Sequence, residues 1–540
     1  MSLPTAAATA PQQGWWRDAV IYQIYVRSFA DANGDGEGDL RGVRQRLPEL
    51  ASLGVDAIWL TPFYVSPLAD GGYDVADYRD VDPRFGTLAD ADALLASAHD
   101  LGLRVIVDIV PNHTSSSHPW FRAAVDAEPG SPERARYIFR PGTGPHGEHP
   151  PNNWRSIFGG PAWTRLRRSD GTPDEWYLHL FDSQQPDLDW SNPEVRQEFD
   201  DVLRFWLDRG VDGFRIDVAH GLVKDPALPD IAPDQQADLL DSETALPYFD
   251  QDGVHDIYRH WRSLVASYPG QRALVAEAWV NDARRVARYL RPDELHQAFN
   301  FEYLTAPWDA TALRRVIDAS LEANGEVGAT TTWVLSNHDV TRHVTRFGGG
   351  TTGLRRARAA ILLTLALPGS TYLYQGEELG LPEVTDLPDE SRQDPTWHRS
   401  GGSQQGRDGC RVPIPWEGTS PPFGFSPDGA RPWLPVPGEW AELSRAAQRD
   451  DPASTLSLYT SALHTRRRLP ALGAGELTWT ASPAGVLDFQ RAPGFRCAVN
   501  LSAAPVELES RGDVVLSSAG ITTGEGTVTL PPDTAVWLRS

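Results

Sequence analysis

The stretch Gly213-Phe-Arg-Ile-Asp-Val-Ala-His220 is the most informative part of the 540-residue sequence. Phe214 and Ile216 alternate with two charged residues, which predicts a buried strand whose two faces differ. Arg215 and Asp217 would lie on the second face, where charge is costly in a parallel sheet unless it is paired. An isolated Arg-x-Asp pair fits a structural ion pair, so further carboxylates at neighbouring strand ends are needed to indicate a site.

Short apolar strands and amphipathic helices alternate on both sides of this stretch. Strands are predicted over residues 20–29, 56–62, 104–110, 213–219, 272–279, 297–303, 331–338 and 371–376. Helices are predicted over residues 38–53, 88–101, 193–209, 254–267, 282–290, 309–323, 353–367 and 453–468. Eight strand–helix pairs predict an α/β fold, a closed (β/α)8 TIM barrel, whose active site lies at the carboxyl ends of the strands.

Three stretches depart from this alternation and define the predicted domains. Residues 111–190 are rich in Gly, Pro, Trp and Asn without a clear period, which predicts an inserted domain after the third strand. A second irregular excursion covers 381–435, and short alternating strands over 471–540 predict a C-terminal all-β domain. The barrel is therefore expected in two parts, 1–110 and 191–470.

The composition narrows the class of partner. The formal net charge of −24 argues against nucleic acid or an anionic membrane and fits a small neutral ligand. The 19 Trp and 15 Tyr residues suit sugar rings, whose apolar faces stack on aromatic side chains. No apolar run approaches the roughly 20 residues of a membrane helix. We expect a monomer or homodimer without an organic cofactor.

The cysteines and the N-terminal residues bear on location. Residues 1–13 lack the basic and apolar regions of a secretory leader, so a cytoplasmic protein is expected. Cys410 and Cys497 are far apart and lack metal-ligand spacing, which predicts unpaired thiols.

Four predicted strands end in an acidic residue, and the same strand ends carry other polar side chains. The acidic residues are Asp108, Asp217, Glu277 and Asp339, and the others are His113, Arg215 and His338. Since the carboxyl ends of barrel strands meet at one face, these side chains are expected to form one site.

Clustered carboxylates without metal-ligand spacing suit acid/base and nucleophilic chemistry on a neutral substrate. Glycoside cleavage needs an ionised carboxylate at the anomeric carbon and a protonated acid at the leaving oxygen. Arg215 would keep Asp217 ionised, which suits the nucleophile. Glu277 is flanked by Ala276, Ala278 and Trp279, a more apolar setting that suits the proton donor. Asp339 could bind sugar hydroxyls.

Five motifs resemble the α-amylase family, glycoside hydrolase family 13, from about Ala19 to the C-terminus. They read Asp108-Ile-Val-Pro-Asn-His113, Gly213-Phe-Arg-Ile-Asp217, Val275-Ala-Glu277, Ser336-Asn-His-Asp339 and Gln185-Pro-Asp-Leu-Asp189. The resemblance implies a nucleophile (Asp217), an acid/base (Glu277), a transition-state stabiliser (Asp339) and three sugar-binding residues (His113, Arg215, His338). It also implies that the insertion is the family's domain B and the tail its β-sandwich domain C.

Within the family, Asp70-Gly-Gly-Tyr-Asp74 resembles the α-glucosidase and oligo-1,6-glucosidase branch. The resemblance implies that Asp70 and Tyr73 bind the terminal glucose, so that the enzyme trims short oligosaccharides from the end. It also implies a sugar-contacting arginine, either Arg407 or Arg411. Alone, Asp70 fits a turn residue before two glycines equally well.

Two other functions remain open at this stage. A transglucosylase or isomerase, of the sucrose isomerase or trehalose synthase type, would share every catalytic residue, because the covalent glucosyl-enzyme is common to both. A non-catalytic transporter subunit of the same family would lack the three carboxylates and carry a membrane helix. The carboxylates are present, which favours an enzyme.

The segment Asp31-Ala-Asn-Gly-Asp-Gly-Glu-Gly-Asp39 has the spacing of the start of a calcium loop. Oxygen side chains fall at positions 1, 3, 5 and 9 (Asp31, Asn33, Asp35, Asp39), and the Glu37 carbonyl falls at position 7. The twelfth position is Gly42 instead of Glu, and an acidic turn is the alternative. Similar loops in this branch bind Ca²⁺, so the resemblance implies a structural calcium ion.

Two sequence features bear on which glycosidic linkage is cleaved, and they favour different linkages. Val218 follows the expected nucleophile, and the resemblance associates valine there with α-1,6 cleavage. The continuation Ala219-His-Gly-Leu-Val-Lys224 looks more like bacterial enzymes that accept short α-1,4 oligosaccharides, and Ala219 and Gly221 could restore room that Val218 takes. We therefore expect release of α-1,4-linked glucose, with α-1,6 linkages tolerated.

Overall fold

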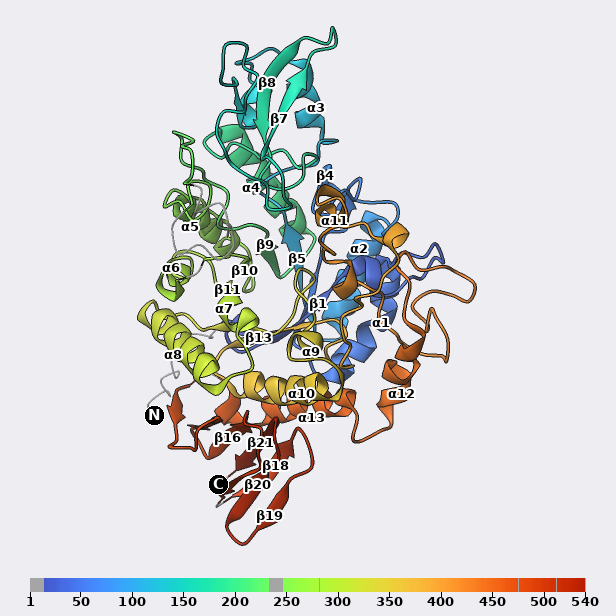
Figure 1. Ribbon diagram of the computed structural model, residues 1–540, viewed down its shortest axis with the longest axis vertical. Helices are drawn as coiled ribbons and strands as arrows, with labels where there is room; N and C mark the ends of the chain where they lie inside the picture. The colour runs from blue at the N-terminus through green and yellow to red at the C-terminus, as the bar shows by residue number, and fades with distance from the viewer. Residues whose placement is uncertain (1–13, 233–245, 281, 474, 511, 540) are drawn as a thin grey trace, which may run out of the picture.

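The computed structural model describes residues 14–232, 246–280, 282–473, 475–510 and 512–539. Eight parallel strands form one sheet in the order β11-β10-β9-β5-β2-β1-β13-β12 (Figure 1). A parallel bridge between Phe299 and Thr332 joins the two ends, so the sheet closes. The strands are β1 (Val20–Ile24), β2 (Ala57–Leu60), β5 (Arg104–Ile109), β9 (Gly213–Ile216), β10 (Ala273–Ala276), β11 (Gln297–Ala298), β12 (Thr332–Val334) and β13 (Ser370–Tyr374). The predicted TIM barrel is confirmed.

The predicted helices are all present, with ends within about three residues of the predicted ones. They are α1 (Leu40–Leu53), α2 (Leu88–Asp100), α4 (Pro193–Asp208), α5 (Val254–Ala266), α6 (Ala283–Arg288), α8 (Ala310–Glu326), α10 (Gly350–Ala366) and α13 (Thr455–Arg468). Their ends follow ordinary capping chemistry: Asp39 accepts the Gly42 N–H at the start of α1, and Gly54 closes it in the left-handed conformation.

Several predicted strands extend past the observed strand ends, and two of them do so by five residues. The segment 297–303 is a strand only as far as Ala298, because the Asn300 side chain accepts the Tyr303 N–H and starts a helix, α7 (Phe301–Thr305). The segment 20–29 leaves the sheet after Ile24 and forms a 3₁₀ turn, Val26–Ser28.

Side chains alternate between the two faces of each barrel strand and therefore pack in two separate apolar cores. Ile21, Trp59 and Val275 belong to the core inside the barrel, whereas Phe214 and Ile216 pack outward with the helices. Arg215 therefore points inward, and it pairs in register with Asp108 on β5 and Val275 on β10. The expected division of the two faces of this strand is confirmed.

The chain leaves the barrel twice at the end where the strands terminate. After β5 come α3 (Pro119–Asp126) and a three-stranded sheet of β6 (Phe139–Arg140), β8 (Pro173–Leu178) and β7 (Trp163–Arg167), at the top of Figure 1. A small hairpin, β3 (Tyr64–Val65) and β4 (Asp77–Val81), precedes this insertion. After β13 the chain forms α11 (Pro395–Arg399), and α12 (Arg445–Arg449) leads back to α13. A short helix, α9 (His343–Arg346), lies between β12 and α10.

The C-terminal part consists of two antiparallel sheets below the barrel (Figure 1). One contains β14 (Leu477–Trp479), β15 (Val486–Arg491), β16 (Phe495–Asn500), β21 (Thr534–Arg539) and β18 (Asp513–Ser517), and the other contains β17 (Val506–Glu509), β20 (Thr527–Leu530) and β19 (Thr522–Gly524). Val486, Val528 and Val536 share one apolar core, so side chains of the two sheets pack together.

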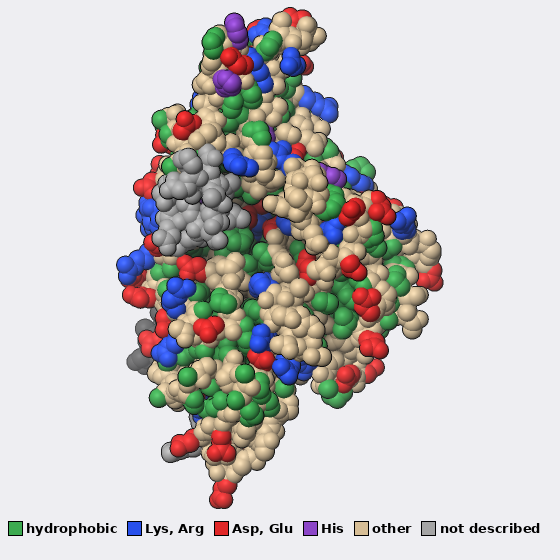
Figure 2. Space-filling model, viewed as in Figure 1, with side chains coloured by type: hydrophobic (Ala, Val, Ile, Leu, Met, Phe, Trp, Pro, Cys, Tyr) green, Lys and Arg blue, Asp and Glu red, His purple; other side chains and the backbone are tan. Residues whose placement is uncertain are grey.

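Several smaller expectations can be placed on the fold. Cys410 and Cys497 are buried free thiols, as predicted. Among the described residues, no helix is long and apolar enough to cross a membrane. The residues used to argue against a secretory leader, 1–13, lie outside the described part of the chain. On the face shown in Figure 2, acidic and basic side chains are interspersed, so the excess of acidic residues forms no single patch there.

We predict that Gly213→Ala destabilises the barrel. A Cβ at this position would lie 2.5 Å from the Ala273 carbonyl oxygen, so β9 and β10 would have to separate. The expected loss in free energy of unfolding is about 1–3 kcal/mol, the usual cost of overpacking. Gly325→Ala is the matched control, because no atom outside the backbone of its own helix lies within 4 Å of its added Cβ. Equal denaturation midpoints for the two variants would contradict the prediction.

Candidate active site

Arg215 is the centre of the site. Its Nη1 lies 2.8 Å from Asp108 Oδ1 and 2.6 Å from Asp217 Oδ1, and its Nη2 lies 2.9 Å from Glu277 Oε2. The arginine side chain is only 2% exposed. Three carboxylates from three adjacent strands thus converge on one buried guanidinium, which the planar fork of five donors suits.

The carboxylates influence one another as well as pairing with the arginine. Burial raises the pKa of Asp217 well above its usual value, and Glu277, Asp108 and Asp339 add to that effect while Arg215 opposes it. Burial likewise raises the pKa of Asp108 to about 6 against the opposing effect of Arg215. The expectation that Arg215 keeps Asp217 ionised is therefore incomplete, because burial and the neighbouring carboxylates raise the pKa that Arg215 lowers. Asp108 and Asp217 therefore retain a proton more readily than isolated carboxylates.

Glu277 is held by directed hydrogen bonds. Val218 N–H donates to its Oε2 at 2.8 Å, and the Trp279 indole N–H donates to its Oε1 at 3.0 Å. The predicted apolar setting is thus wrong in detail, because Trp279, two residues along the chain, and Val218, at the end of the adjacent strand, place donors on both oxygens. Val218 adopts φ +46°, a left-handed conformation that is strained for a β-branched residue.

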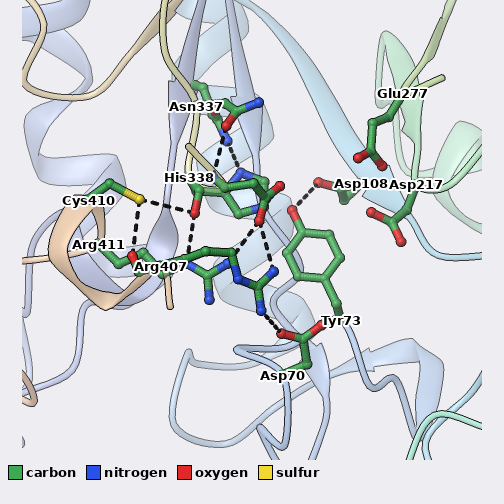
Figure 3. Close-up of polar contacts among 12 residues, drawn as sticks. Asp70, Tyr73, Asp108, Asp217, Glu277, Asn337, His338, Arg407, Cys410 and Arg411 are labelled. Carbon is green, nitrogen blue, oxygen red and sulfur yellow. Dashed lines mark hydrogen bonds and ion pairs between the residues drawn. The ribbon is translucent and has the colours of Figure 1, made fainter. Parts of the chain in front are cut away.

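A second charged group is centred on Arg407, which Tyr73 separates from Asp217 and Glu277 (Figure 3). Arg407 contacts Asp70 Oδ1 at 2.6 Å, Asp339 Oδ1 at 3.0 Å and Asp394 Oδ2 at 2.5 Å. Arg411 reaches the same Asp339 oxygen at 3.0 Å but is almost fully buried. Burial opposes ionisation of Asp339, yet Arg407 and Arg411, together with His338 when that ring is protonated, outweigh it and lower the pKa of Asp339 below its usual range.

Two histidines complete the wall between these groups. The His338 ring stacks on Tyr73 with centroids 5.1 Å apart and planes 10° apart. The Tyr73 hydroxyl donates to Asp108 at 3.0 Å, and His113 Nε2 lies 3.1 Å from the Tyr73 carbonyl. Burial lowers the pKa of both histidines, so both rings are neutral near neutral pH.

These side chains surround a cavity of about 260 Å³. Its lining includes Asp70, Tyr73, His113, Asp217, Glu277, His338, Asp339 and Arg407. All three predicted catalytic residues and five of the predicted sugar-binding residues thus meet in one cavity, while Arg215 and Arg411 lie behind its wall. Of the two arginines that the sequence left undecided, Arg407 is the one that reaches the cavity.

Sequence reasoning missed part of the lining. Ile157, Phe158 and Phe181 come from the insertion, Phe249 from the chain before α5, and Thr396 from α11. No motif marks these residues. The aromatic richness of the chain was the one indication, and it does not say which rings reach the cavity.

The loop 31–39 lies apart from this cavity. The Asp31 carboxylate accepts N–H groups of Asn33, Gly34 and Gly36, and the Glu37 side chain pairs with Arg27 at 2.6 Å. Glu37 could therefore offer a calcium ion only its main-chain carbonyl. Nowhere in the described chain do three or more His, Cys, Asp and Glu side chains converge on a possible metal position. Oxygen donors of the kind calcium prefers are present, and the calcium ion remains a prediction.

Comparisons with known proteins agree with this geometry. The catalytic domain of α-amylase matches residues 23–475. A probable α-glucosidase of Rhizobium meliloti (strain 1021) is 41% identical, over 93% of this chain and 92% of that protein. An oligo-1,6-glucosidase of Parageobacillus thermoglucosidasius is 36% identical over 84% of each chain. The crystal structure of the α-glucosyl transfer enzyme XgtA matches with a TM-score of 0.86 at 38% identity, over 98% of this chain and 99% of that one.

A closed barrel with paired carboxylates and an aromatic-lined cavity at its strand ends fits an enzyme that cleaves glycosidic bonds. The chain belongs to the α-amylase family and is a glycoside hydrolase.

We predict that calcium stabilises the fold through the loop 31–39. The loop's neighbours are the 27–28 turn and the excursion after β13, since Gly36 O accepts the Trp433 N–H at 2.9 Å and Asp31 N–H donates to Phe425 O at 2.7 Å. Removing the ion with a chelator should lower Tm by several degrees, and Asp35→Ala should abolish that response. A Tm indifferent to chelator and to added calcium would contradict the prediction.

Proposed function

We propose that this enzyme is a retaining, exo-acting α-glucosidase that releases terminal glucose from short gluco-oligosaccharides. The observation that carries the proposal is the pairing of Asp217 and Glu277 with the two terminal nitrogens of one guanidinium. Carboxyl groups held this way would lie on the order of 5 Å apart, the separation typical of retaining glycosidases.

In the proposed mechanism Asp217 attacks the anomeric carbon and forms a covalent glucosyl-enzyme. Glu277 protonates the leaving oxygen, then removes a proton from the water that releases glucose. The elevated pKa of Asp217 in the free site supports a shared proton within the cluster. That proton would move to Glu277 when the substrate excludes water and Asp217 commits to attack.

The proposed exo action, in which the enzyme binds the terminal glucose of the chain, rests on Asp70 and Arg407. Their ion pair, 2.6 Å long, lies at the cavity wall, and the Arg407 guanidinium covers the Phe158 ring at 4.8 Å. A carboxylate and an arginine placed there could bind the hydroxyls of a terminal glucose and would leave no path for a longer chain. Asp339, ionised between two arginines, would bind further hydroxyls of the same ring.

The linkage preference depends on the residue after the proposed nucleophile. Val218 lines the cavity, and an added Cβ at Gly221 would lie 2.6 Å from Val218 Cγ1. Because Gly221 has no side chain, Val218 can pack against it instead of projecting further into the cavity. The space left for the substrate supports acceptance of α-1,4 as well as α-1,6 linkages. We propose α-1,4 as the preferred linkage.

A transglucosylase or isomerase is the second candidate, favoured by the likeness to XgtA. The two activities differ in whether water or a sugar hydroxyl attacks the glucosyl-enzyme. The test is to incubate the enzyme with maltose, isomaltose, sucrose and trehalose and to resolve the products. Free glucose as the main product supports the hydrolase, whereas isomers or longer oligosaccharides as the main product would establish the second candidate.

We predict that Asp217→Asn lowers kcat by roughly 10⁴-fold, the scale seen when a catalytic side chain is removed. The fold should remain intact, because the amide keeps a hydrogen-bond acceptor for Arg215. Asp77→Asn, at an exposed position, serves as the control. Kinetics with maltose and a Tm measurement check both points, and near-wild-type turnover of the first variant would exclude Asp217 as the nucleophile.

We also predict that Val218→Thr, which replaces one methyl group by a hydroxyl, raises the maltose-to-isomaltose ratio of kcat/KM by about 10-fold, the scale of a single-group change in a pocket. The control is Val514→Thr, an exposed residue of strand β18 in the C-terminal domain. An unchanged ratio, or a wild-type enzyme that cleaves isomaltose far faster than maltose, would show that another residue sets the linkage.

A further inference from the structure

Lys224 is the only lysine in the sequence, and every other Lys or Arg position is an arginine. It lies on the loop after β9, and its side chain is only 3% exposed. Elsewhere the chain uses arginine even in buried ion pairs, as at Arg215. A lysine at this one buried position indicates a need for a compact ammonium group that arginine cannot replace.

The contacts of Lys224 explain this need. Its Nζ donates to Asn112 Oδ1 at 2.7 Å and lies 2.8 Å from Asp187 Oδ2. Asn112 follows β5, and Asp187 belongs to the last part of the insertion, so one nitrogen joins three chain segments. Both partners are fully buried. A planar guanidinium could not place a single nitrogen between them without displacing one of them.

The ammonium group fixes the orientation of the Asn112 amide. Lysine has only donors, so the amide oxygen must face Nζ and the amide nitrogen must face the other way. On that side Asn112 Nδ2 lies 3.1 Å from Asp187 Oδ2 and 3.1 Å from His113 Nδ1. A flipped amide would direct its N–H groups at the ammonium and its oxygen at the carboxylate.

The amide in turn fixes the tautomer of His113. Because Asn112 Nδ2 is a donor, His113 Nδ1 must accept, and the ring proton lies on Nε2. That N–H points at the Tyr73 carbonyl, 3.1 Å away, beside the cavity. Gln185 Nε2 lies equally near the ring, but its two N–H groups have other acceptors, Asp70 Oδ2 at 3.1 Å and the Tyr73 carbonyl at 3.4 Å.

We propose that Lys224 is a positioning residue that fixes the Nε2–H tautomer of His113 and keeps that ring neutral where the glucosyl unit binds. The role of the ring in binding rests on the proposed function, whereas the tautomer does not. The charged groups around the ring are Asp187 and Asp70, which favour its protonated form, and Lys224, which disfavours it. Burial acts in the same direction as Lys224 and is the larger effect.

The first test is Lys224→Met. The uncompensated Asp187 should raise the pKa of His113, so the acid limb of the kcat/KM profile should move up by roughly one pH unit, as expected for a neighbouring charge. The double variant K224M/D187N removes both charges and should return the limb toward its wild-type position. Should K224M not fold, K224Q keeps a donor toward Asn112 without the charge and should show the same shift.

The second test does not depend on activity. In protein labelled with ¹⁵N-histidine, and with His113→Gln to assign the signals, the ring shifts should show a protonated Nε2 and an unprotonated Nδ1. In K224M or K224Q the titration of that ring should move upward. If the wild type hydrolyses no α-glucoside, the proposed function fails while this measurement still decides the role of Lys224. A protonated Nδ1 in the wild type, or an unmoved titration in a folded variant, would overturn the inference.

Discussion

The ion pairs of Arg215 with three carboxylates are the constraint on which the rest of the site depends. Asp108, Asp217 and Glu277 reach the guanidinium from β5, β9 and β10, within 2.9 Å in every case. Removing the arginine would leave three buried carboxylates unpaired, and breaking even one such pair typically costs about 3–5 kcal/mol. The barrel supplies the register that makes the arrangement possible, since Asp108 and Arg215 are direct partners across two strands.

The two excursions from the barrel supply the rest of the cavity. The insertion after β5 contributes Phe158 and Phe181, and the excursion after β13 contributes Arg407. The second excursion is tied down at several points: the Ser28 hydroxyl donates to the Arg411 carbonyl, and Trp433 Nε1 donates to Ser28 Oγ at 3.0 Å. The face of Trp433 also covers Arg27, which pairs with Glu37 of the loop 31–39. This loop therefore supports the segment that carries Arg407, although it lies apart from the cavity.

The barrel and the residues at its strand ends could be predicted because periodicity and charge mark them directly. Arg215 and Asp217 stand out in a strand that should be apolar, and Glu277 and Asp339 fall at the ends of predicted strands. The segment 301–305 was misjudged because its helix depends on one side-chain cap, that of Asn300, which competes with an apolar pattern typical of a strand. The setting of Glu277 was misjudged because the indole of Trp279 and the amide of Val218 turn toward it only once the loops fold. Phe158 and Lys224 could not be placed at all, since their partners are distant in sequence and no local pattern links them.

The most direct test of the account is to trap the glucosyl-enzyme. A slowly turned-over fluorinated glucosyl fluoride should leave one hexosyl group on the protein, and mass spectrometry of the peptides should locate it on Asp217. Nuclear magnetic resonance of an untrapped reaction should show α-glucose as the first product, since two displacements at the anomeric carbon retain its configuration. Label on another residue, or β-glucose released first without any trapped adduct, would contradict the central role given to Asp217.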